Sequence, residues 1–179
     1  MKKTVLLIIA FLMLPSSLVA QKDFSDLDQV GDAIKERIRE DMKDWKCHDI
    51  EPMAFENTPP SDDLRIQQWV SGSRDVRLVL HRHPSAVEAS RALRQFAATS
   101  RVKGYVNGLA DEAYIHGGRN AIAFRKGNLL VYVSAIVIKE NYTDAEKKDP
   151  KYASGLDLDE EAKLTSAFAQ HVASALKKL

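Results

Sequence analysis

The sequence has only one cysteine, Cys47, in its 179 residues. An internal disulfide is therefore excluded, and the stability of the chain must come from a packed core. Hydrophobic residues make up 45% of the chain, which is ordinary for a folded protein and argues against intrinsic disorder. The lone thiol has three interpretations, as a buried, a reactive or an intermolecularly paired group, and burial is the simplest of them.

A strong charge of either sign is also missing, because 26 basic side chains stand against 25 acidic ones. Such a balance gives no general attraction to nucleic acid or to anionic lipid. We therefore expect no nucleic-acid partner.

The one long apolar run lies near the N-terminus, from Val5 to Pro15, and is too short to cross a bilayer comfortably. Basic residues precede it, and small residues follow it up to Ala20. This order is typical of a secretory signal peptide. We predict a signal peptide at residues 1–20 and a single domain at residues 21–179 that is periplasmic or secreted. Because no cysteine follows Ala20 directly to carry a lipid, we expect no stable membrane anchor.

Three segments carry the apolar spacing of three and four residues that is typical of amphipathic helices. They span residues 26–46, 85–100 and 158–177. Ser85 and Asp157 stand at the start of the second and third helices, each with a glutamate three residues later. This is the capping-box arrangement, and it predicts where both helices begin.

Five segments read as strands, at residues 64–71, 75–83, 113–116, 120–126 and 129–138. Gly127-Asn128 is a two-residue hairpin turn, and it predicts a register in which Phe124 faces Val131 and Ile122 faces Val133. Together these elements predict an α+β fold with a mainly antiparallel five-stranded sheet flanked by three helices, in the order α-β-β-α-β-β-β-α.

Histidines offer one candidate metal site. His81 and His83 are two positions apart on a strand and point to the same face. His116, or the neighbouring pair Asp111-Glu112, supplies a third ligand, and zinc accepts such a set. The alternative is that these histidines are solvated at a strand end.

Other catalytic patterns are weak. Cys47-His48-Asp49 has the residue types of a thiol triad, but consecutive residues rarely reach one another in the required geometry. We place Cys47 at the end of the first helix, where the helix dipole disfavours a thiolate. No glycine-rich phosphate loop is present, and we expect no cofactor.

Four residues are candidates for binding a ligand. Arg119 and Arg125 lie around the predicted hairpins and could hold an anion, although a solvated rim is the simpler interpretation. Trp69 shares a strand face with Arg65 and forms a second candidate surface. The alternative for Trp69 is burial under a helix on the second side of the sheet.

Two long irregular loops, at residues 49–63 and 139–156, are further candidate surfaces, because structureless connections of this length are uncommon without a role. The second loop contains Asn141-Tyr142-Thr143, which matches the sequon for glycosylation. A bacterial host would leave that sequon unused.

One run of residues is similar to a known pattern. Gly108-Leu109-Ala110-Asp111-Glu112-Ala113-Tyr114 is followed by Phe124-Arg125-Lys126-Gly127-Asn128 and then by Val131-Tyr132-Val133-Ser134. This resembles exported bacterial domains with a Gly-Leu-Gly-Asp-Glu-Ala segment and an Arg-x-Gly-Asn hairpin, here with Ala110 for the second glycine. Those domains are similar to the Mog1/PsbP-like α/β/α sandwich. The resemblance covers residues 64–138 and implies a non-enzymatic role in the envelope, with no catalytic residues to carry over.

Three hypotheses follow. The first is a soluble exported binding or accessory domain without catalytic activity, whose partner is an unknown protein or small molecule in the envelope. The second is a small metal-dependent hydrolase that uses His81, His83 and His116. The third is an interaction module that dimerises through Cys47 or an exposed edge strand. The sequence leaves the oligomeric state open.

Overall fold

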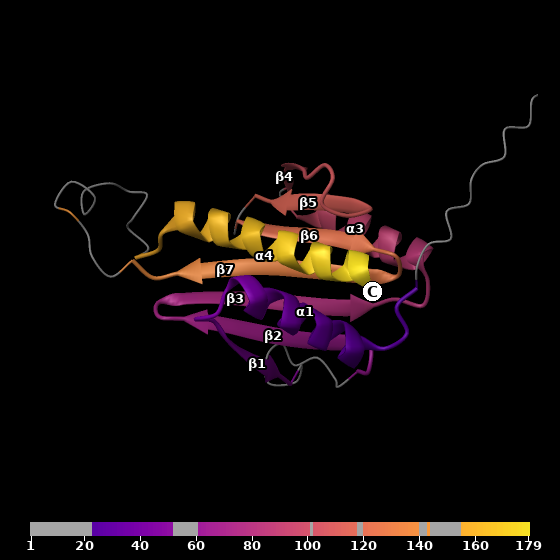
Figure 1. Ribbon diagram of the computed structural model, residues 1–179. Coiled ribbons are helices and arrows are strands. Elements are labelled where there is room, and N and C mark those ends of the chain that lie inside the picture. The colour runs from indigo at the N-terminus through magenta and orange to yellow at the C-terminus, as the bar shows by residue number, and fades with distance from the viewer. Residues whose placement is uncertain (1–22, 52–60, 101, 118–119, 140–142, 144–154) are drawn as a thin grey trace, which may run out of the picture.

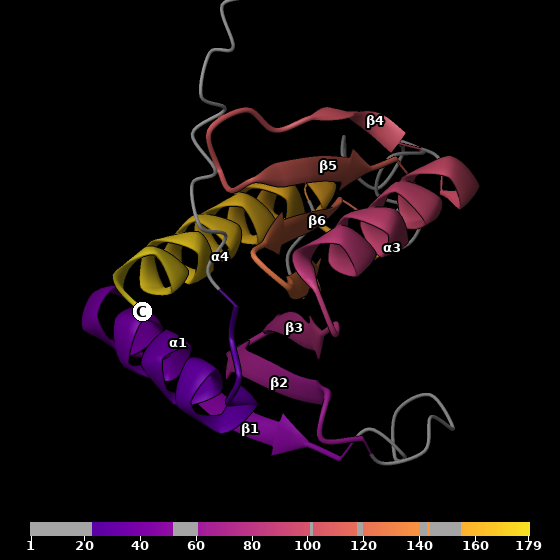
Figure 2. The same ribbon diagram turned by 90° about the vertical axis from the view of Figure 1, so that its right-hand side faces the viewer.

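The computed structural model describes residues 23–51, 61–100, 102–117, 120–139, 143 and 155–179. The predicted signal peptide, Arg119 and the Asn141 sequon lie outside these residues, as does much of both long loops. The described elements form three layers, with helices α1 and α4 on one face of a sheet and helix α3 on the other (Figures 1 and 2). The elements are α1 (Leu27–Asp41), β1 (Lys46–Ile50), β2 (Leu64–Ser71), β3 (Arg74–Arg82), α3 (Ala86–Thr99), β4 (Val102–Tyr105), β5 (Glu112–His116), β6 (Ala121–Lys126), β7 (Leu129–Val137) and α4 (Leu158–Lys178).

The sheet has seven strands in the order β1-β2-β3-β7-β6-β5-β4, and all neighbouring pairs are antiparallel. The α+β class and the three helices agree with the sequence-based prediction. The five-stranded sheet and the element order are wrong, because they omit β1 and β4. The order in the structure is α-β-β-β-α-β-β-β-β-α.

Both omitted strands lie at the edges of the sheet. None of the residues of β1 is fully buried, so its sequence shows no clean apolar alternation. β4 has four residues, and its register shifts between Val102 and Gly104. An edge strand contacts only one neighbour, and the apolar pattern that identifies a strand is correspondingly weak.

Helix α1 is shorter than predicted. It ends at Asp41, and Met42 caps it with a backbone bond from its N–H to the Ile38 carbonyl. Cys47 therefore lies in strand β1 and not at a helix terminus. Trp45, in the connection, still packs into the core, with its ring 4.9 Å from that of Phe168.

The predicted caps and the predicted hairpin register are confirmed. Ser85 Oγ accepts from the Glu88 N–H at 3.2 Å, and Asp157 Oδ1 accepts from the Glu160 N–H at 3.1 Å. Phe124 pairs with Val131 across β6 and β7. The turn between these strands places Gly127 at φ +57°, as the first position of a type II′ turn requires.

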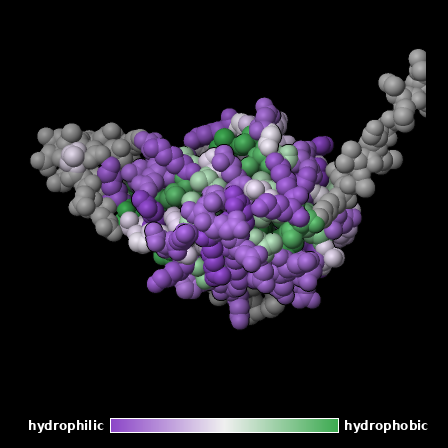
Figure 3. Space-filling model, viewed as in Figure 1, coloured by the Kyte–Doolittle hydropathy of each residue, from purple (hydrophilic) through white to green (hydrophobic). Residues whose placement is uncertain are grey.

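The core lies on both faces of the sheet. On one face, α1 and α4 cover a cluster in which Trp69 and Phe168 are fully buried. On the other face, Leu93 of α3 packs against Tyr114 and Ala123. The outer surface of the α1 and α4 layer is mostly hydrophilic (Figure 3). Within the described residues, no helix has both the length and the apolar character needed for a membrane crossing.

Asn128, in the β6–β7 turn, fastens the N-terminal segment to the sheet. Its side chain accepts from the Phe24 N–H at 2.7 Å and donates to the Phe24 carbonyl at 3.1 Å. The same amide donates to the His83 carbonyl at 3.1 Å. One side chain thus joins three segments of the chain.

Candidate functional site

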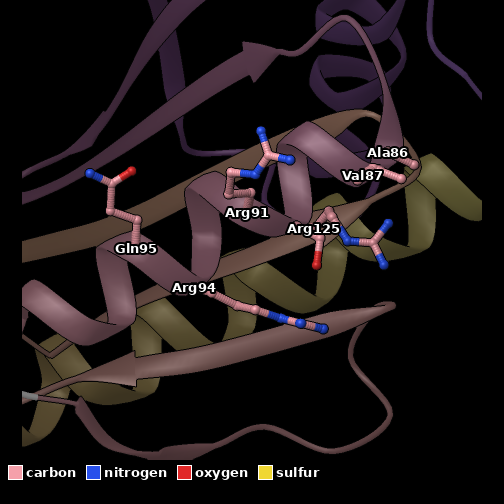
Figure 4. A pocket seen from close by; sticks show the side chains of 7 residues that line it. Ala86, Val87, Arg91, Arg94, Gln95 and Arg125 are labelled. Atoms are coloured by element: carbon pink, nitrogen blue, oxygen red, sulfur yellow. The ribbon is translucent and has the colours of Figure 1, made fainter.

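A groove of about 750 Å³ lies along the outer side of α3 and reaches Arg125 of β6 (Figure 4). We call it the arginine groove. It is lined by Ala86, Val87, Ser90, Arg91, Arg94, Gln95 and Arg125. Helix α3 turns Ala89 and Leu93 to the sheet, where both are fully buried. The amphipathic pattern therefore directs the polar positions of the helix to solvent.

Arg125 is the buried end of the arginine groove, and its guanidinium is held by several acceptors. Its Nη1 donates to the Gly127 carbonyl at 2.9 Å and to Asp111 Oδ2 at 3.2 Å, and its Nε donates to Glu112 Oε2 at 3.4 Å. Only 6% of the residue is exposed. Because these bonds fix the planar guanidinium, Arg125 supplies a positive charge in a set position.

Glu112 ties the helix to the sheet. It accepts from Ser90 Oγ at 2.7 Å and from Nε and Nη2 of Arg94 at 3.0 and 2.8 Å. Burial alone would raise the pKa of Glu112, but the hydrogen bonds from Ser90 and Arg94 outweigh it, and the pKa is lowered overall. Glu112 is thus ionised at neutral pH and holds Arg94 beside the arginine groove.

Asp111 joins the entry of β5 to the β6–β7 turn. Its backbone N–H donates to the Arg125 carbonyl at 3.0 Å, and its carboxylate accepts from the Gly127 N–H and from Lys126 Nζ, both at 2.9 Å. Burial acts to raise the pKa of Asp111, but the bonds from Gly127 and Lys126 lower it overall. The Asp-Glu pair of the motif is therefore a structural clamp between β5, α3 and the hairpin.

The charges around the arginine groove do not balance. Asp111 and Glu112 pair with Arg125, Lys126 and Arg94. Two carboxylates thus serve three cations. Arg91 adds a fourth, and its side chain forms no hydrogen bond or ion pair with the residues that the structure describes. The arginine groove therefore carries a surplus of positive charge.

Of the four residues predicted to bind a ligand, the three that the structure describes do not come together at one site. Trp69 is fully buried, with its ring 6.0 Å from that of Phe168 under the α1 and α4 layer. Arg65 lies on that same face, where it donates to the Asp28 carbonyl at 2.9 Å and to Asp49 Oδ1 at 3.3 Å. Of the four, Arg125 is the one that lines the arginine groove, and Arg119 lies outside the described residues.

The three histidines do not form a metal centre. The rings of His81 and His83 lie side by side, 4.3 Å apart. His116 is on β5 and packs against Phe96 with the rings 5.9 Å apart, and strands β7 and β6 separate it from β3. Burial lowers the pKa of both His81 and His83, which keeps this pair neutral. Among the described residues, no three side chains of the metal-binding types gather at one point.

Cys47 does not have the environment of a nucleophile. Burial raises the pKa of its thiol to about 11. Its strand position opposite Trp69 turns it toward the core, and His48, the next residue, is on the other face of β1. A thiol in this state is a small packing group, because the thiolate is the reactive form.

Sequence reasoning missed Arg91 and Arg94. A solvated helix face also carries arginines, so their type alone is uninformative. The available signal is their spacing of three residues, which places both on neighbouring turns of the same helix face. Their significance depends on Arg125, which comes from a strand far away in the sequence.

The Asp111-Glu112 and Arg125-Lys126 segments that resemble Mog1/PsbP-like domains thus form the clamp beside the arginine groove. The assignment to that family stays a proposal. Comparisons of the chain with protein-family models, with curated proteins and with solved structures gave no match.

Proposed function

We propose that this chain is a soluble exported binding or accessory domain without catalytic activity, which binds a small anionic ligand in the arginine groove. The observation that carries this proposal is the surplus cation, Arg91, which lines the same groove as Arg94 and the buried Arg125. Electrostatic attraction of this kind favours carboxylate and phosphate groups over neutral ligands.

The chemistry of the lining supports an anion in particular. A guanidinium presents a planar fork of donors that fits a carboxylate or a phosphate with two parallel hydrogen bonds. Arg94 uses Nε and Nη2 for Glu112, so its Nη1 is left for a ligand on the open side of the groove. Ser90 and Gln95 add polar atoms along the same wall. The volume of the arginine groove, about 750 Å³, suits a small molecule.

Export is part of this proposal and rests on the residues before Gln21. The similarity to exported Mog1/PsbP-like domains also favours a binding role over catalysis. The metal-dependent hydrolase has less support, since His81 and His83 are separated from His116 by two strands of the sheet.

Isothermal titration with citrate and with inorganic phosphate at low ionic strength tests the proposal. Arg91→Ala should weaken binding by about ten-fold or more, because a hydrogen bond to a charged group contributes about 1.5–3 kcal/mol. Arg39→Ala is the matched control, since Arg39 is an exposed arginine in the last turn of α1, on the opposite layer. It should leave the affinity unchanged.

Two results would contradict the proposal. One is that neither anion binds at millimolar concentration. The other is that Arg91→Ala and Arg39→Ala reduce the affinity equally, which would indicate a general charge effect with no defined site. Circular dichroism of both variants checks that the fold is retained.

A further inference from the structure

An aromatic pair lies at the edge of the sheet, near Arg94 of the arginine groove. Tyr105, on the edge strand β4, is 74% exposed and is the most exposed large apolar side chain among those that the structure describes. Its ring lies 4.9 Å from that of Tyr114 on β5. Tyr114 is itself buried against Leu93 of α3, so it provides a rigid base for the exposed ring.

The aromatic pair and the arginine groove adjoin each other. Glu112, which holds Arg94, is two residues before Tyr114 on the same face of β5, a separation of about 7 Å along a strand. Burial raises the pKa of the Tyr114 phenol, and the negative charge of Glu112 adds to this effect. The phenol therefore lies near the Arg94–Glu112 ion pair. In Figure 2, α3 packs beside β5, and β4 is the next strand out.

We propose that the anionic ligand is an acidic saccharide, with one sugar ring on Tyr105 and a carboxylate of the same or the next sugar at Arg94 and Arg91. This inference rests on the proposed function and adds the class of ligand. A sugar ring has an apolar face of C–H groups that packs on an exposed aromatic ring, while its hydroxyls stay in water.

A nucleotide also combines a ring with a negative charge, but the surroundings of Tyr105 favour a sugar. A base that is recognised by a protein is commonly stacked and also hydrogen-bonded along its edges. Tyr105 instead offers an open ring face on a solvent-exposed edge strand, and Tyr114 is the aromatic residue that contacts its ring. An exposed aromatic ring of this kind suits a sugar ring whose hydroxyl groups remain hydrated.

The test titrates the protein with trigalacturonate, with uncharged galactotriose and with citrate. Tyr105→Ala should weaken trigalacturonate binding by about ten-fold and leave citrate binding within about two-fold of the wild type. Arg91→Ala should weaken both. Ile138→Ala is the control, because Ile138 is another exposed apolar side chain, 56% exposed, and follows β7 outside the arginine groove. It should change neither affinity.

The outcomes separate the two proposals. If the wild-type protein does not bind citrate, both the anion site and the saccharide proposal are refuted. A second outcome refutes the saccharide proposal alone. In this outcome citrate binding depends on Arg91, but trigalacturonate binds no more tightly than citrate, or its binding is unchanged by Tyr105→Ala. Tighter binding of a nucleoside monophosphate or of polyglutamate than of trigalacturonate also overturns the saccharide. Galactotriose should bind much more weakly than trigalacturonate, and equal binding would contradict the role of the arginines.

Discussion

Replacement of Asn128 by alanine should destabilise the fold far more than is usual for a residue in a hairpin turn. The side chain makes three hydrogen bonds, two with the backbone of Phe24 and one with the His83 carbonyl. Asn128 and Phe24 are both 5% exposed, so water cannot easily replace the lost partners. A typical intramolecular hydrogen bond contributes about 0.5–1.5 kcal/mol. The expected loss in the free energy of unfolding is therefore about 3 kcal/mol, or about 6–12 °C in melting temperature.

Urea denaturation followed by tryptophan fluorescence measures this loss. Both tryptophans of the chain, Trp45 and Trp69, pack against Phe168 and report on the core. Asn107→Ala is the control, because Asn107 is an exposed asparagine before β5, and its removal should cost less than about 0.5 kcal/mol.

A second variant, Asn128→Asp, separates the hydrogen bonds from the turn. Aspartate is as acceptable in a turn as asparagine, but its carboxylate cannot donate to the carbonyls of Phe24 and His83. It should therefore be as destabilising as Asn128→Ala or more so. A loss below about 1 kcal/mol in both variants, with unchanged hydrogen exchange at the Phe24 amide, would refute the reasoning.

Three further predictions concern other buried polar contacts. A Cβ atom at Gly31 would come within 2.5 Å of the guanidinium at the end of Arg65, which would have to leave its hydrogen bonds to Asp28 and Asp49. Gly31→Ala should therefore lower the free energy of unfolding in urea. In an Arg65→Ala background the same change should raise that free energy by about 1 kcal/mol through helix propensity, and stabilisation in both backgrounds contradicts the contact. Burial raises the pKa of Glu161, and a group whose folded pKa lies above its unfolded pKa stabilises the fold at low pH and loses this contribution as the pH rises through the folded pKa. The wild type should thus lose stability relative to Glu161→Gln between about pH 4 and about pH 7, which the urea midpoints of both proteins measure. The same difference in midpoint at both pH values would contradict a raised pKa of Glu161. Because the pKa of Cys47 is about 11, iodoacetamide should alkylate it slowly in the native protein at mildly alkaline pH and rapidly in urea, as mass spectrometry would measure; equal rates contradict its burial.

The helices and inner strands were predictable because burial imposes a period on them. β7, for example, has Val131 and Val133 fully buried under α4, and its other face carries Tyr132 beneath α3. Sequence alone therefore indicates a strand that is covered on both sides. The two-residue turn then sets the register, since a shift by one residue would turn every buried valine outward.

The edge strands were not predictable in the same way. β1 has no buried residue, and its one close neighbour is β2. Its pairing rests on backbone hydrogen bonds and on the ion pair between Asp49 and Arg65, and neither leaves an apolar pattern in the sequence. β4 has the same disadvantage and also contains Gly104, which weakens a strand pattern.

The candidate site was predictable only in part. Arg125 stands out because it adjoins a hairpin turn, but the sequence does not indicate that Arg91 and Arg94 lie next to it. That neighbourhood arises when α3 packs on β5 and β6, a long-range contact. Trp69 illustrates the opposite problem, because β2 carries apolar side chains on both faces, Ile66 on one and Trp69 on the other. Such a sequence gives no sign of which face is accessible to a ligand.

The state of the two carboxylates at the arginine groove bears on the choice between binding and catalysis. A general acid at neutral pH needs a carboxyl group whose pKa is raised, so that it still carries a proton. Asp111 and Glu112 have lowered pKa values, and their oxygens accept hydrogen bonds from Gly127, Ser90 and Arg94. Both carboxylates are ionised and already accept hydrogen bonds, so they are suited to holding the arginines in place. The same clamp that removes them from acid–base chemistry leaves the positive side of the cluster facing the groove, where a ligand of opposite charge would bind.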